Sequence, residues 1–346
     1  MRFAVIGAGT IGQLRAQSIK ANPGTELLGV ADPTVAQAER AVAGSGAKAL
    51  SDWRAALSLP GVQAVMVSSP IQFHEEAVLA ALHAGLHVLC EKPMSNTVES
   101  CRRMLDAARA SGRTLATGFN HRYYPAMKFL KQAIDDGQIG AVDHVRIFGG
   151  HDGLHNFRAD WQYKAPVSGG GAMMDVGIHM TDLARFVLGE VSEVYGVASN
   201  RVLQVPGSED NAMAIFKSPS GVAATYEATW TEWKGYQFYV EAYGEKGMVR
   251  GSYAPMQNVL ITQDRPGAPR KKARRFYPEI MVREKLKSWT STALVSFQDE
   301  LVDFLRMANG EKTNLADAVA GFRAVEMAHA VYQSSKTGKP VALAKL

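Results

Sequence analysis

Residues Met1–Gly12, MRFAVIGAGTIG, open the chain with a short apolar run that spaced glycines follow at once. The apolar run, Arg2–Ile6, has the composition of a buried strand, and Ile11–Lys20 has that of a helix. The glycines between them stand at G-x-G-x-x-G spacing: Gly7, Gly9 and Gly12. A strand, a glycine turn and a helix in this order predict the first unit of a dinucleotide-binding fold.

Each part of this motif has its own physical reason. Gly7 permits the tight turn, Gly9 lets a pyrophosphate approach the backbone, and Gly12 lets the helix pack close to the strand. The helix start, at Thr10 and Ile11, offers unpaired N–H groups and a partial positive charge to the phosphates. The alternative is a glycine-rich turn that binds nothing.

A second predicted strand, Glu26–Val30, leads to Asp32, which lies 20 residues after Gly12. A carboxylate there accepts hydrogen bonds from the adenine ribose hydroxyls and repels the 2′-phosphate of NADP. No basic residue follows Asp32 until Arg40. We therefore expect NAD as the cofactor rather than NADP, with an ordinary strand-end aspartate as the alternative.

Strand and helix patterns alternate over the first 120 residues. Further strands are predicted at Ala64–Val67, His87–Cys90 and Thr114–Thr117, and helices at Glu75–Ala84 and Thr97–Ser111. This alternation predicts an α/β Rossmann domain, residues 1–120, with a doubly wound parallel sheet. Ligands of such sheets bind beyond the carboxyl ends of the strands. The further cofactor candidates there are Ser68, Ser69, Pro70, His74, Glu91, Lys92 and Asn120. His74 could instead cap the following helix, and Glu91 could be a residue that approaches a helix.

After a predicted linking helix, Pro125–Asp136, the chain becomes rich in strands. These are Val142–Phe148, Val191–Ser199, Asn211–Phe216, Val222–Trp230, Gln237–Tyr243 and Met248–Gly251. Two helices follow, at about Ala293–Ala308 and Leu315–Ser334. Residues 121–346 are therefore predicted to form an α+β domain for substrate binding and oligomerisation, with a large, mostly antiparallel open sheet.

The composition is typical of a globular protein. Of 346 residues, 47% are hydrophobic and 21% charged, and this length suits two domains. Neither a membrane-length apolar run nor a signal peptide is present, so we expect a cytoplasmic protein without a membrane partner. The cysteines, Cys90 and Cys101, form no disulfide framework and are expected to be core thiols.

Much of the net charge of +5 comes from one segment: Arg270, Lys271, Lys272, Arg274 and Arg275. It follows a Pro- and Gly-containing stretch, so we expect a solvated loop. It has no aromatic interleaving, and we therefore expect no nucleic-acid partner. The nearest approach to metal-ligand spacing is His151, Asp152 and His155, and we expect no metal site.

Two blocks of sequence resemble one known family. Glu91-Lys92-Pro93, after a strand of the predicted dinucleotide fold, resembles the E-K-P signature of the glucose-fructose oxidoreductase / inositol dehydrogenase / rhizopine catabolism (Gfo/Idh/MocA) family. Gly169–Asp182, GGGAMMDVGIHMTD, resembles its G-G-G…D-x-G-x-H-x-x-D segment. The resemblance spans the whole chain and implies dimers or tetramers built through the second-domain sheet.

The resemblance implies a catalytic role for Lys92, whose ammonium can stabilise developing alkoxide charge. Asp175 and His179 lie four residues apart, which places both on one face of a helical segment. The imidazole suits proton transfer from a hydroxyl, and Asp175 can orient it or hold a substrate hydroxyl. A structural histidine is the alternative reading of His179.

Other substrate candidates lie in loops or after strands. Asn120, His121 and Arg122 follow the last predicted strand of the first domain, and Tyr236 precedes a strand of the second. An irregular polar and aromatic loop adds Asp152, His155, Arg158 and Trp161, the last suited to the face of a sugar. For each, surface or packing duty is the alternative.

The sequence thus predicts an NAD-dependent dehydrogenase acting on a secondary hydroxyl of a sugar, cyclitol or related polyol. The polyhydroxylated substrate is implied by the resemblance. Two alternatives remain: a redox-neutral enzyme that recycles bound NAD, as in glycoside cleavage through a transient ketone, and an NAD(P)-sensing binding protein.

Overall fold

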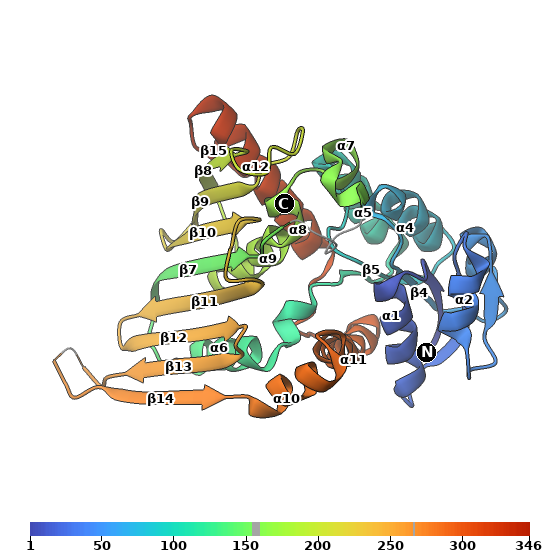
Figure 1. Cartoon of the computed structure of the whole chain (residues 1–346), viewed down its shortest axis with the longest axis horizontal. Helices are drawn as coiled ribbons and strands as arrows, with labels where there is room; N and C mark the ends of the chain where they lie inside the picture. The colour runs from blue at the N-terminus through green and yellow to red at the C-terminus, as the bar shows by residue number, and fades with distance from the viewer. Residues whose placement is uncertain (154–159, 266) are drawn as a thin grey trace. The chain divides into compact units, whose positions relative to one another are not determined.

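Two β-sheets organise the chain in the computed structural model, which describes residues 1–153, 160–265 and 267–346 (Figure 1). The first compact unit contains Met1–Tyr123 and Leu286–Phe322, and the second contains Tyr124–Lys285 and Arg323–Leu346. Helices α10, Pro278–Lys287, and α12, Ala318–Thr337, carry the chain across the later two boundaries. The predicted division at residue 120 is therefore too simple, because residues 286–322 return to the first unit.

The first unit is built on a parallel sheet of six strands in the order β3-β2-β1-β4-β5-β6. The strands are β1 (Arg2–Ile6), β2 (Glu26–Ala31), β3 (Lys48–Leu50), β4 (Ala64–Val67), β5 (His87–Cys90) and β6 (Leu115–Thr117). Its helices are α1 (Thr10–Ala21), α2 (Val35–Val42), α3 (Trp53–Leu57), α4 (His74–His83), α5 (Val98–Ser111) and α11 (Thr290–Ala308), with short 3₁₀ turns η1 (Ile71–Phe73) and η2 (Asn120–Tyr123). The predicted doubly wound parallel sheet is confirmed.

Alternate side chains of β1 enter different core clusters. Phe3 and Val5 share one cluster with Leu301 and Phe304 of α11, whereas Ala4 packs in another with Ala56 of α3. Successive side chains of a strand point to opposite faces, so the sheet is covered on both sides. The packing of α11 here is the physical reason that the late segment belongs to the first unit.

The second unit holds a mixed sheet of nine strands in the order β14-β13-β12-β11-β7-β10-β9-β8-β15. The strands are β7 (Val142–Gly150), β8 (Glu193–Ser199), β9 (Asn211–Lys217), β10 (Ala223–Thr229), β11 (Gln237–Gly244), β12 (Gly247–Tyr253), β13 (Gln257–Thr262), β14 (Lys271–Phe276) and β15 (Val341–Ala342). Only the pair β7 and β10 is parallel, so the predicted mostly antiparallel sheet is confirmed.

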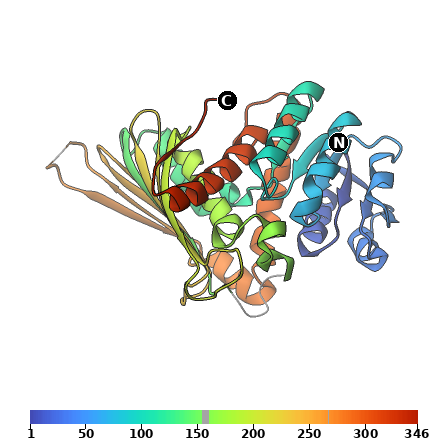
Figure 2. The same cartoon turned by 90° about the horizontal axis from the view of Figure 1, so that it is seen from above.

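Helices cover one face of this sheet. They include α6 (Pro125–Asp135), α8 (Ala172–Asp175) and α9 (Gly177–Leu188); α7 (Ala165–Ser168) and the turn η3 (Asp160–Tyr163) precede them in the chain. Helix α9 contacts β7 and β10, and α6 contacts β12. In Figure 2 no helix of the described residues lies on the opposite face, which is therefore open.

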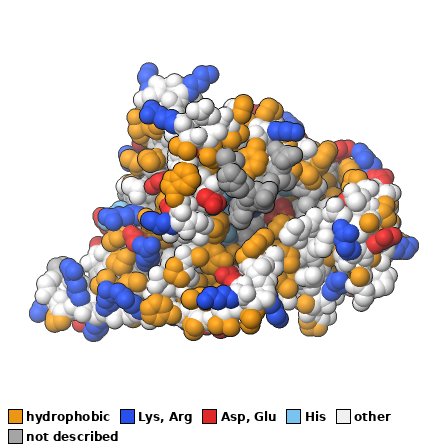
Figure 3. Space-filling model, viewed as in Figure 1, with side chains coloured by type: hydrophobic (Ala, Val, Ile, Leu, Met, Phe, Trp, Pro, Cys, Tyr) orange, Lys and Arg blue, Asp and Glu red, His pale blue; other side chains and the backbone are white. Residues whose placement is uncertain are grey.

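The basic segment is a strand rather than the predicted loop. Lys271–Phe276 forms β14, which pairs antiparallel with β13 at the edge of the sheet. All six of its residues are exposed, and Lys and Arg side chains gather over this edge in Figure 3. Because no face of β14 is buried, its sequence has no hydrophobic alternation to reveal it. Charged side chains on an edge strand oppose pairing with other chains.

Within the described ranges, no helix combines the length and the apolar character needed to cross a membrane.

Candidate active site

The glycine turn after β1 leaves room at one position only. A Cβ atom on Gly7 would lie 2.6 Å from the backbone of Ser68, and one on Gly12 would lie 1.9 Å from the carbonyl oxygen of Gly7. A Cβ atom on Gly9 would meet no atom of the described residues within 4 Å. Gly7 and Gly12 are thus required by the packing of the chain itself, whereas Gly9 borders open space.

Polar groups lie both at the start of α1 and in the loop after β4, which packs against Gly7 and Gly12. Gly9 precedes α1 without a side-chain capping bond, and the first turn, from Thr10 and Ile11, has no acidic residue. The hydroxyls of Ser68 and Ser69, just after β4, are buried and have no hydrogen-bond partner among the described residues. Buried polar atoms of this kind are ordinarily satisfied by a ligand or water. These residues therefore fit a dinucleotide, whose pyrophosphate the start of α1 would hold.

Asp32 ties the end of β2 to the glycine turn. Its Oδ2 accepts a hydrogen bond from the backbone N–H of Ala8 at 2.8 Å, and Oδ1 accepts one from Thr34 at 2.8 Å. Each carboxylate oxygen can accept a second bond, so the ribose role predicted for Asp32 stays open to it. The aspartate also shapes the turn, which the sequence pattern did not indicate.

His74 bridges two loops at the carboxyl edge of the sheet. Its Nε2 lies 2.8 Å from the carbonyl oxygen of Ser69, and its Nδ1 lies 3.0 Å from that of Pro93. The ring is buried, and burial lowers its pKa. It begins α4 without a capping bond, so the structure favours a brace between the Ser68–Pro70 and E-K-P loops over a helix cap.

The E-K-P turn follows β5 directly. The Lys92–Pro93 peptide bond is cis, and Lys92 is half-buried. Glu91 is engaged by the protein itself, since its Oε1 accepts a hydrogen bond from Arg15 Nε at 2.7 Å. This bond to a helical residue favours the reading of Glu91 as a residue that approaches a helix.

The turn η2 after β6 is held by the C-terminal segment of the first unit. Asn120 Nδ2 donates to Ser296 Oγ at 2.8 Å, and Arg122 Nη1 donates to the carbonyl oxygen of Asn314 at 2.9 Å. The pKa of His121 lies well below its usual value of 6.5. The larger cause is burial of the ring, and the smaller is the positive charge of Lys92. A neutral imidazole beside an ammonium is thus a feature of this unit.

In the second unit Asp175 is fixed by two donors. His151 Nε2 donates to Asp175 Oδ2 at 2.8 Å, and Trp230 Nε1 donates to the same oxygen at 3.0 Å. His151 Nδ1 accepts a bond from the backbone N–H of Gly153 at 2.9 Å, so the proton of a neutral ring is on Nε2. The carboxylate of Asp175 is therefore held in one orientation.

Asp175 ends α8, and His179 lies in the first turn of α9. Val176 between the helices has helical backbone angles, so the predicted helical spacing of the two residues agrees with the structure. Both are buried. The preceding glycines are braced by Glu209, which accepts bonds from the N–H groups of Gly171 at 2.8 Å and Met173 at 2.7 Å.

The remaining candidates differ in their surroundings. The ring of Tyr236 stacks toward His151 with centroids 6.4 Å apart, Trp161 is half-buried in η3, and Asp152 is exposed. His155 and Arg158 lie outside the described residues. The parts of the chain that the structure describes contain no cluster of three or more potential metal ligands.

His151 and Trp230 are the residues of this cluster that the sequence did not assign to it. His151 directly follows β7, and Trp230 directly follows β10. The last residues of these parallel strands, Gly150 and Thr229, are paired, so the side chains that follow come together. Both residues directly follow strands, but the sequence does not indicate that these two strands pair with each other.

A parallel sheet with a glycine cradle open at Gly9, joined to a mixed-sheet unit carrying buried polar side chains, defines a dinucleotide-binding oxidoreductase of two units. Residues 1–119 match the model "Oxidoreductase family, NAD-binding Rossmann fold", and residues 127–250 match "GFO/IDH/MocA C-terminal domain". The chain belongs to the Gfo/Idh/MocA family of oxidoreductases, and its first unit is an NAD-binding Rossmann domain.

Relatives match along nearly the whole chain. An "Inositol 2-dehydrogenase" of Pseudomonas savastanoi pv. phaseolicola is 30% identical, with 99% of this chain and 97% of the relative covered. An "Uncharacterized oxidoreductase YrbE" of Bacillus subtilis is 28% identical, with 98% of this chain and 95% of the relative covered. A solved structure, "Levoglucosan dehydrogenase, complex with NADH", superposes with a TM-score of 0.87 over 100% of both chains at 24% identity, which shows the shared fold.

Proposed function

We propose that this chain is an NAD-dependent dehydrogenase that oxidises a secondary hydroxyl of a sugar, cyclitol or related polyol. The observation that carries the proposal is the open space at Gly9, together with the buried hydroxyls of Ser68 and Ser69, which have no hydrogen-bond partner among the described residues. The relatives named as inositol dehydrogenases support the substrate class. Asp32 supports NAD over NADP through its charge.

In the proposed reaction His179 accepts the proton of the reacting hydroxyl, while the ammonium of Lys92 stabilises the oxyanion that develops. NAD, when bound, would accept at C4 of its nicotinamide the hydride that leaves the alcohol carbon, and this carbon would become the carbonyl carbon. Asp175 is fixed by His151 and Trp230, and it would hold a substrate hydroxyl or orient His179. The Ser68–Pro70 loop, braced by His74, would border the nicotinamide ribose.

Other residues are proposed as binding groups of the substrate or cofactor. Trp161 and Tyr236 offer aromatic faces for the apolar side of a sugar ring. Asn120 and Arg122 already donate hydrogen bonds within the first unit, so a substrate would share these side chains with the protein. His121 is neutral at pH 7 because burial and Lys92 lower its pKa, and it therefore offers a ring nitrogen rather than a charge.

The test is a screen of the purified protein with NAD or NADP against cyclitols, sugars and anhydrosugars, followed by NADH absorbance. Net NADH formation that saturates with one polyol supports the proposal. Product formation from a glycoside without net NADH indicates instead that bound cofactor is recycled. Cofactor binding without turnover of any class of compound indicates a sensing protein.

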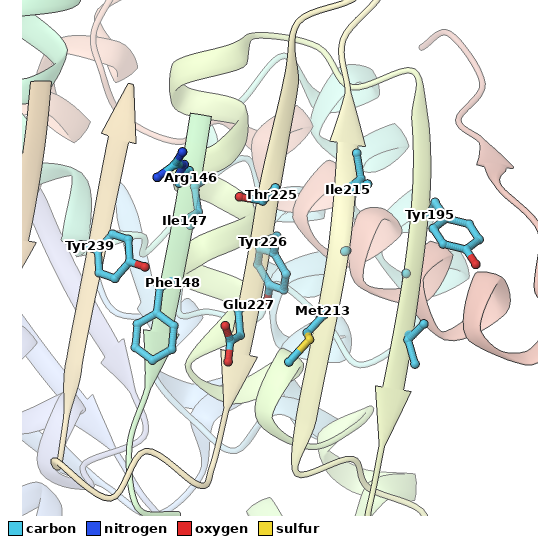
Figure 4. Close-up of a pocket in the computed structure, with 13 residues that line it drawn as sticks. Arg146, Ile147, Phe148, Tyr195, Met213, Ile215, Thr225, Tyr226, Glu227 and Tyr239 are labelled. Atoms are coloured by element: carbon cyan, nitrogen blue, oxygen red, sulfur yellow. The ribbon is translucent and has the colours of Figure 1, made fainter. Parts of the chain in front are cut away.

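We further propose that the open face of the nine-stranded sheet pairs with a second copy of this chain. Its side chains form a shallow pocket, and those of Phe148, Tyr239, Met213 and Glu227 stand on neighbouring strands (Figure 4). Val197 and Met213 are each 56% exposed and Ile215 49%. An apolar patch of this kind on a sheet marks an interface.

A further inference from the structure

A buried ionic cluster of the first unit lies beside the E-K-P turn and takes no part in the proposed chemistry. It consists of Arg15 on α1, Glu91 after β5 and Glu300 on α11. The side chains of Arg15 and Glu300 are 1% and 0% exposed, and that of Glu91 is 13% exposed. Burial of charged groups costs free energy unless each group has a partner. The ion pairs within the cluster therefore determine whether each of its side chains is charged and how firmly it is held.

The guanidinium of Arg15 joins the two carboxylates. Its Nε donates to Glu91 Oε1 at 2.7 Å, and Nη2 lies 2.6 Å from the same oxygen. Its Nη1 donates to Glu300 Oε2. The ring of Phe297 lies against the guanidinium, 3.8 Å from its central carbon. Two nitrogens of the guanidinium thus lie against one oxygen of Glu91, one of them through a hydrogen bond and the other through an ion pair, while the third bonds Glu300.

The backbone of Gly118, directly after β6, closes the cluster on another side. A Cβ atom on Gly118 would lie 2.6 Å from Arg15 Nη2 and 3.2 Å from the carboxylate of Glu91. The guanidinium and the Glu91 carboxylate are therefore packed against Gly118. With Phe297 and Glu300 also in contact with it, Arg15 has little room to take another position.

Glu91 connects this cluster to the lysine. Its backbone N–H donates to the carbonyl oxygen of Val67 at 2.8 Å, which holds the end of β5 in the sheet. Its Oε2 accepts the backbone N–H of Lys92 at 3.4 Å. The carboxylate that Arg15 orients thus also contacts the first peptide group of the turn that carries Lys92.

We propose that Glu300 is a positioning residue for Lys92, acting through Arg15 and Glu91 on the backbone of the E-K-P turn. The inference rests on the proposed function, in which Lys92 stabilises the oxyanion. An error of about 1 Å in the placement of such a group costs up to about 100-fold in rate.

The charge of the cluster makes this positioning sensitive to pH. Two carboxylates share one guanidinium, and Glu300 Oε1 has no hydrogen-bond partner in the described part of the chain. The groups that face Glu300 are Arg15, Glu91, and Arg122 and Tyr123 of η2, with Asp303 on its own helix beside Tyr123. Burial raises the pKa of Glu300 to about 7, with Arg15 opposing and Glu91 adding to the rise.

A protonated Glu300 leaves the guanidinium charge to Glu91, whereas an ionised Glu300 competes for it. The hold on Glu91, and through it on Lys92, therefore weakens as the pH rises through about 7. Glu300→Gln keeps an acceptor oxygen for Arg15 and removes the titration. Glu300→Leu removes the acceptor as well, so Arg15 loses the bond from Nη1 that fixes the direction of its guanidinium toward Glu91.

The experiment compares Glu300→Leu, Glu300→Gln and Glu311→Gln, a matched control at an exposed glutamate that pairs with Arg306. We expect Glu300→Leu to lower kcat by about 10-fold or more while the Kd of NAD changes less than threefold, since the glycine cradle is untouched. Glu300→Gln should keep kcat at pH 6 and lose the decline of kcat near pH 7. A folded Glu300→Leu protein with wild-type kcat, or an unchanged pH profile in Glu300→Gln, would overturn the proposal.

A second readout separates this proposal from the proposed function. If the wild-type protein turns over no polyol, the function fails, and amide hydrogen exchange of the peptide spanning residues 91–94 still tests the positioning. Faster exchange in Glu300→Leu than in Glu300→Gln and Glu311→Gln supports it. Equal exchange rates in the three variants overturn the proposal. The same measurement tests the positioning role if Glu300→Leu has no measurable activity.

Discussion

Lys92 and His179 carry the central prediction about single residues. If both act on the reacting hydroxyl, Lys92→Met and His179→Ala should each reduce kcat by about 10²-fold or more, the usual range for a proton-transfer group or an oxyanion donor. The Kd of NAD should change little, because the phosphates are expected at the Gly9 cradle. Combined, the two losses should be less than additive, since groups that act as a unit fail together.

Steady-state kinetics and NAD titration of folded variants measure this, with Lys336→Met as the control at an exposed lysine. Near-wild-type turnover in either variant contradicts the assignment of that residue. A loss of NAD affinity in Lys92→Met, without a separate loss of kcat, would move Lys92 to a cofactor-binding role.

Asp32 is predicted to set the preference between the two cofactors. Asp32→Asn removes the charge that repels a 2′-phosphate, so the ratio of NADP to NAD affinity should rise by roughly tenfold or more. The amide nitrogen of the asparagine cannot accept the N–H of Ala8 or Thr34, so one of the two bonds is lost at a cost of about 1 kcal/mol.

A control variant tests whether the position of the lost charge matters. Asp52→Asn alters an aspartate whose Oδ1 accepts the N–H of Arg54 in another helix cap, with no predicted contact to the cofactor. The oxygen of the asparagine can still accept that bond, so this variant should change stability little and keep the NAD preference. Equal affinities of the wild-type protein for NAD and NADP would remove the basis of the prediction.

Some functional residues could be predicted from the sequence, whereas contacts between distant residues could not. Gly9 and Asp32 were predictable because a local pattern states both their conformation and their place after a strand. The bond from Asn120 to Ser296 joins residues 176 positions apart, and no local pattern reports such a contact. The same holds for His151 and Trp230, whose meeting depends on the parallel pairing of β7 with β10.

The start of α1 allows binding and folding to be tested separately. Gly9 has a negative φ of −63°, and no described residue lies within 4 Å of where its Cβ atom would stand. Gly9→Ala should therefore change the free energy of unfolding by less than about 0.5 kcal/mol. The added methyl group would stand where the pyrophosphate is expected. We therefore predict a loss of NAD affinity of at least about tenfold, or 1.4 kcal/mol.

Gly12→Ala is the matched comparison in the same turn. Its Cβ atom would lie 1.9 Å from the carbonyl oxygen of Gly7, so this variant should lose roughly 1–3 kcal/mol of stability or more. Thermal unfolding and NAD titration of both variants distinguish the two roles. Unchanged NAD affinity in a stable Gly9→Ala protein would show that the space above Gly9 is not the cofactor cradle.

Helix α11 carries a prediction about stability and pH. The pKa of Glu300 rises from 4.5 to about 7 on folding, so the folded state holds its proton more tightly. Its contribution to stability is present below about pH 4.5 and is lost as the pH rises through about 7. Glu300→Gln lacks this loss, so its stability relative to wild type should increase between pH 5 and 8, by up to about 3 kcal/mol. Urea unfolding at several pH values measures the difference, and a constant difference across this range contradicts it.

The edge strand β14 shows why some elements escape prediction. The sheet strands β7 to β10 have one buried face and an alternating pattern, whereas Lys271–Phe276 buries neither face and is held by backbone bonds to β13. The return of the chain to the first unit was not predicted for a similar reason. That Leu286–Phe322 belongs with the first unit follows from the packing of Leu301 and Phe304 against β1, a contact between distant segments.

The prediction that the protein forms oligomers rests on the open face of the nine-stranded sheet. Along β8 and β9 the outward residues Tyr195, Val197, Met213 and Ile215 are exposed and apolar, while charged residues of both signs, Arg146 and Glu227, stand farther along the same face. A face that holds both an apolar strip and opposite charges can match a second copy of itself across a two-fold axis. We therefore expect a homodimer or homotetramer in solution.

Ile215→Glu and Met213→Glu place a charge in the middle of this strip, and burying an unpaired carboxylate in an interface is costly. Both variants should shift the mass measured by light scattering toward that of the monomer at micromolar concentration. Val35→Glu, at an exposed valine of α2 in the first unit, is the matched control and should keep the wild-type mass. A wild-type protein that is monomeric at this concentration contradicts the prediction outright, and oligomers that survive both glutamates place the interface on another surface.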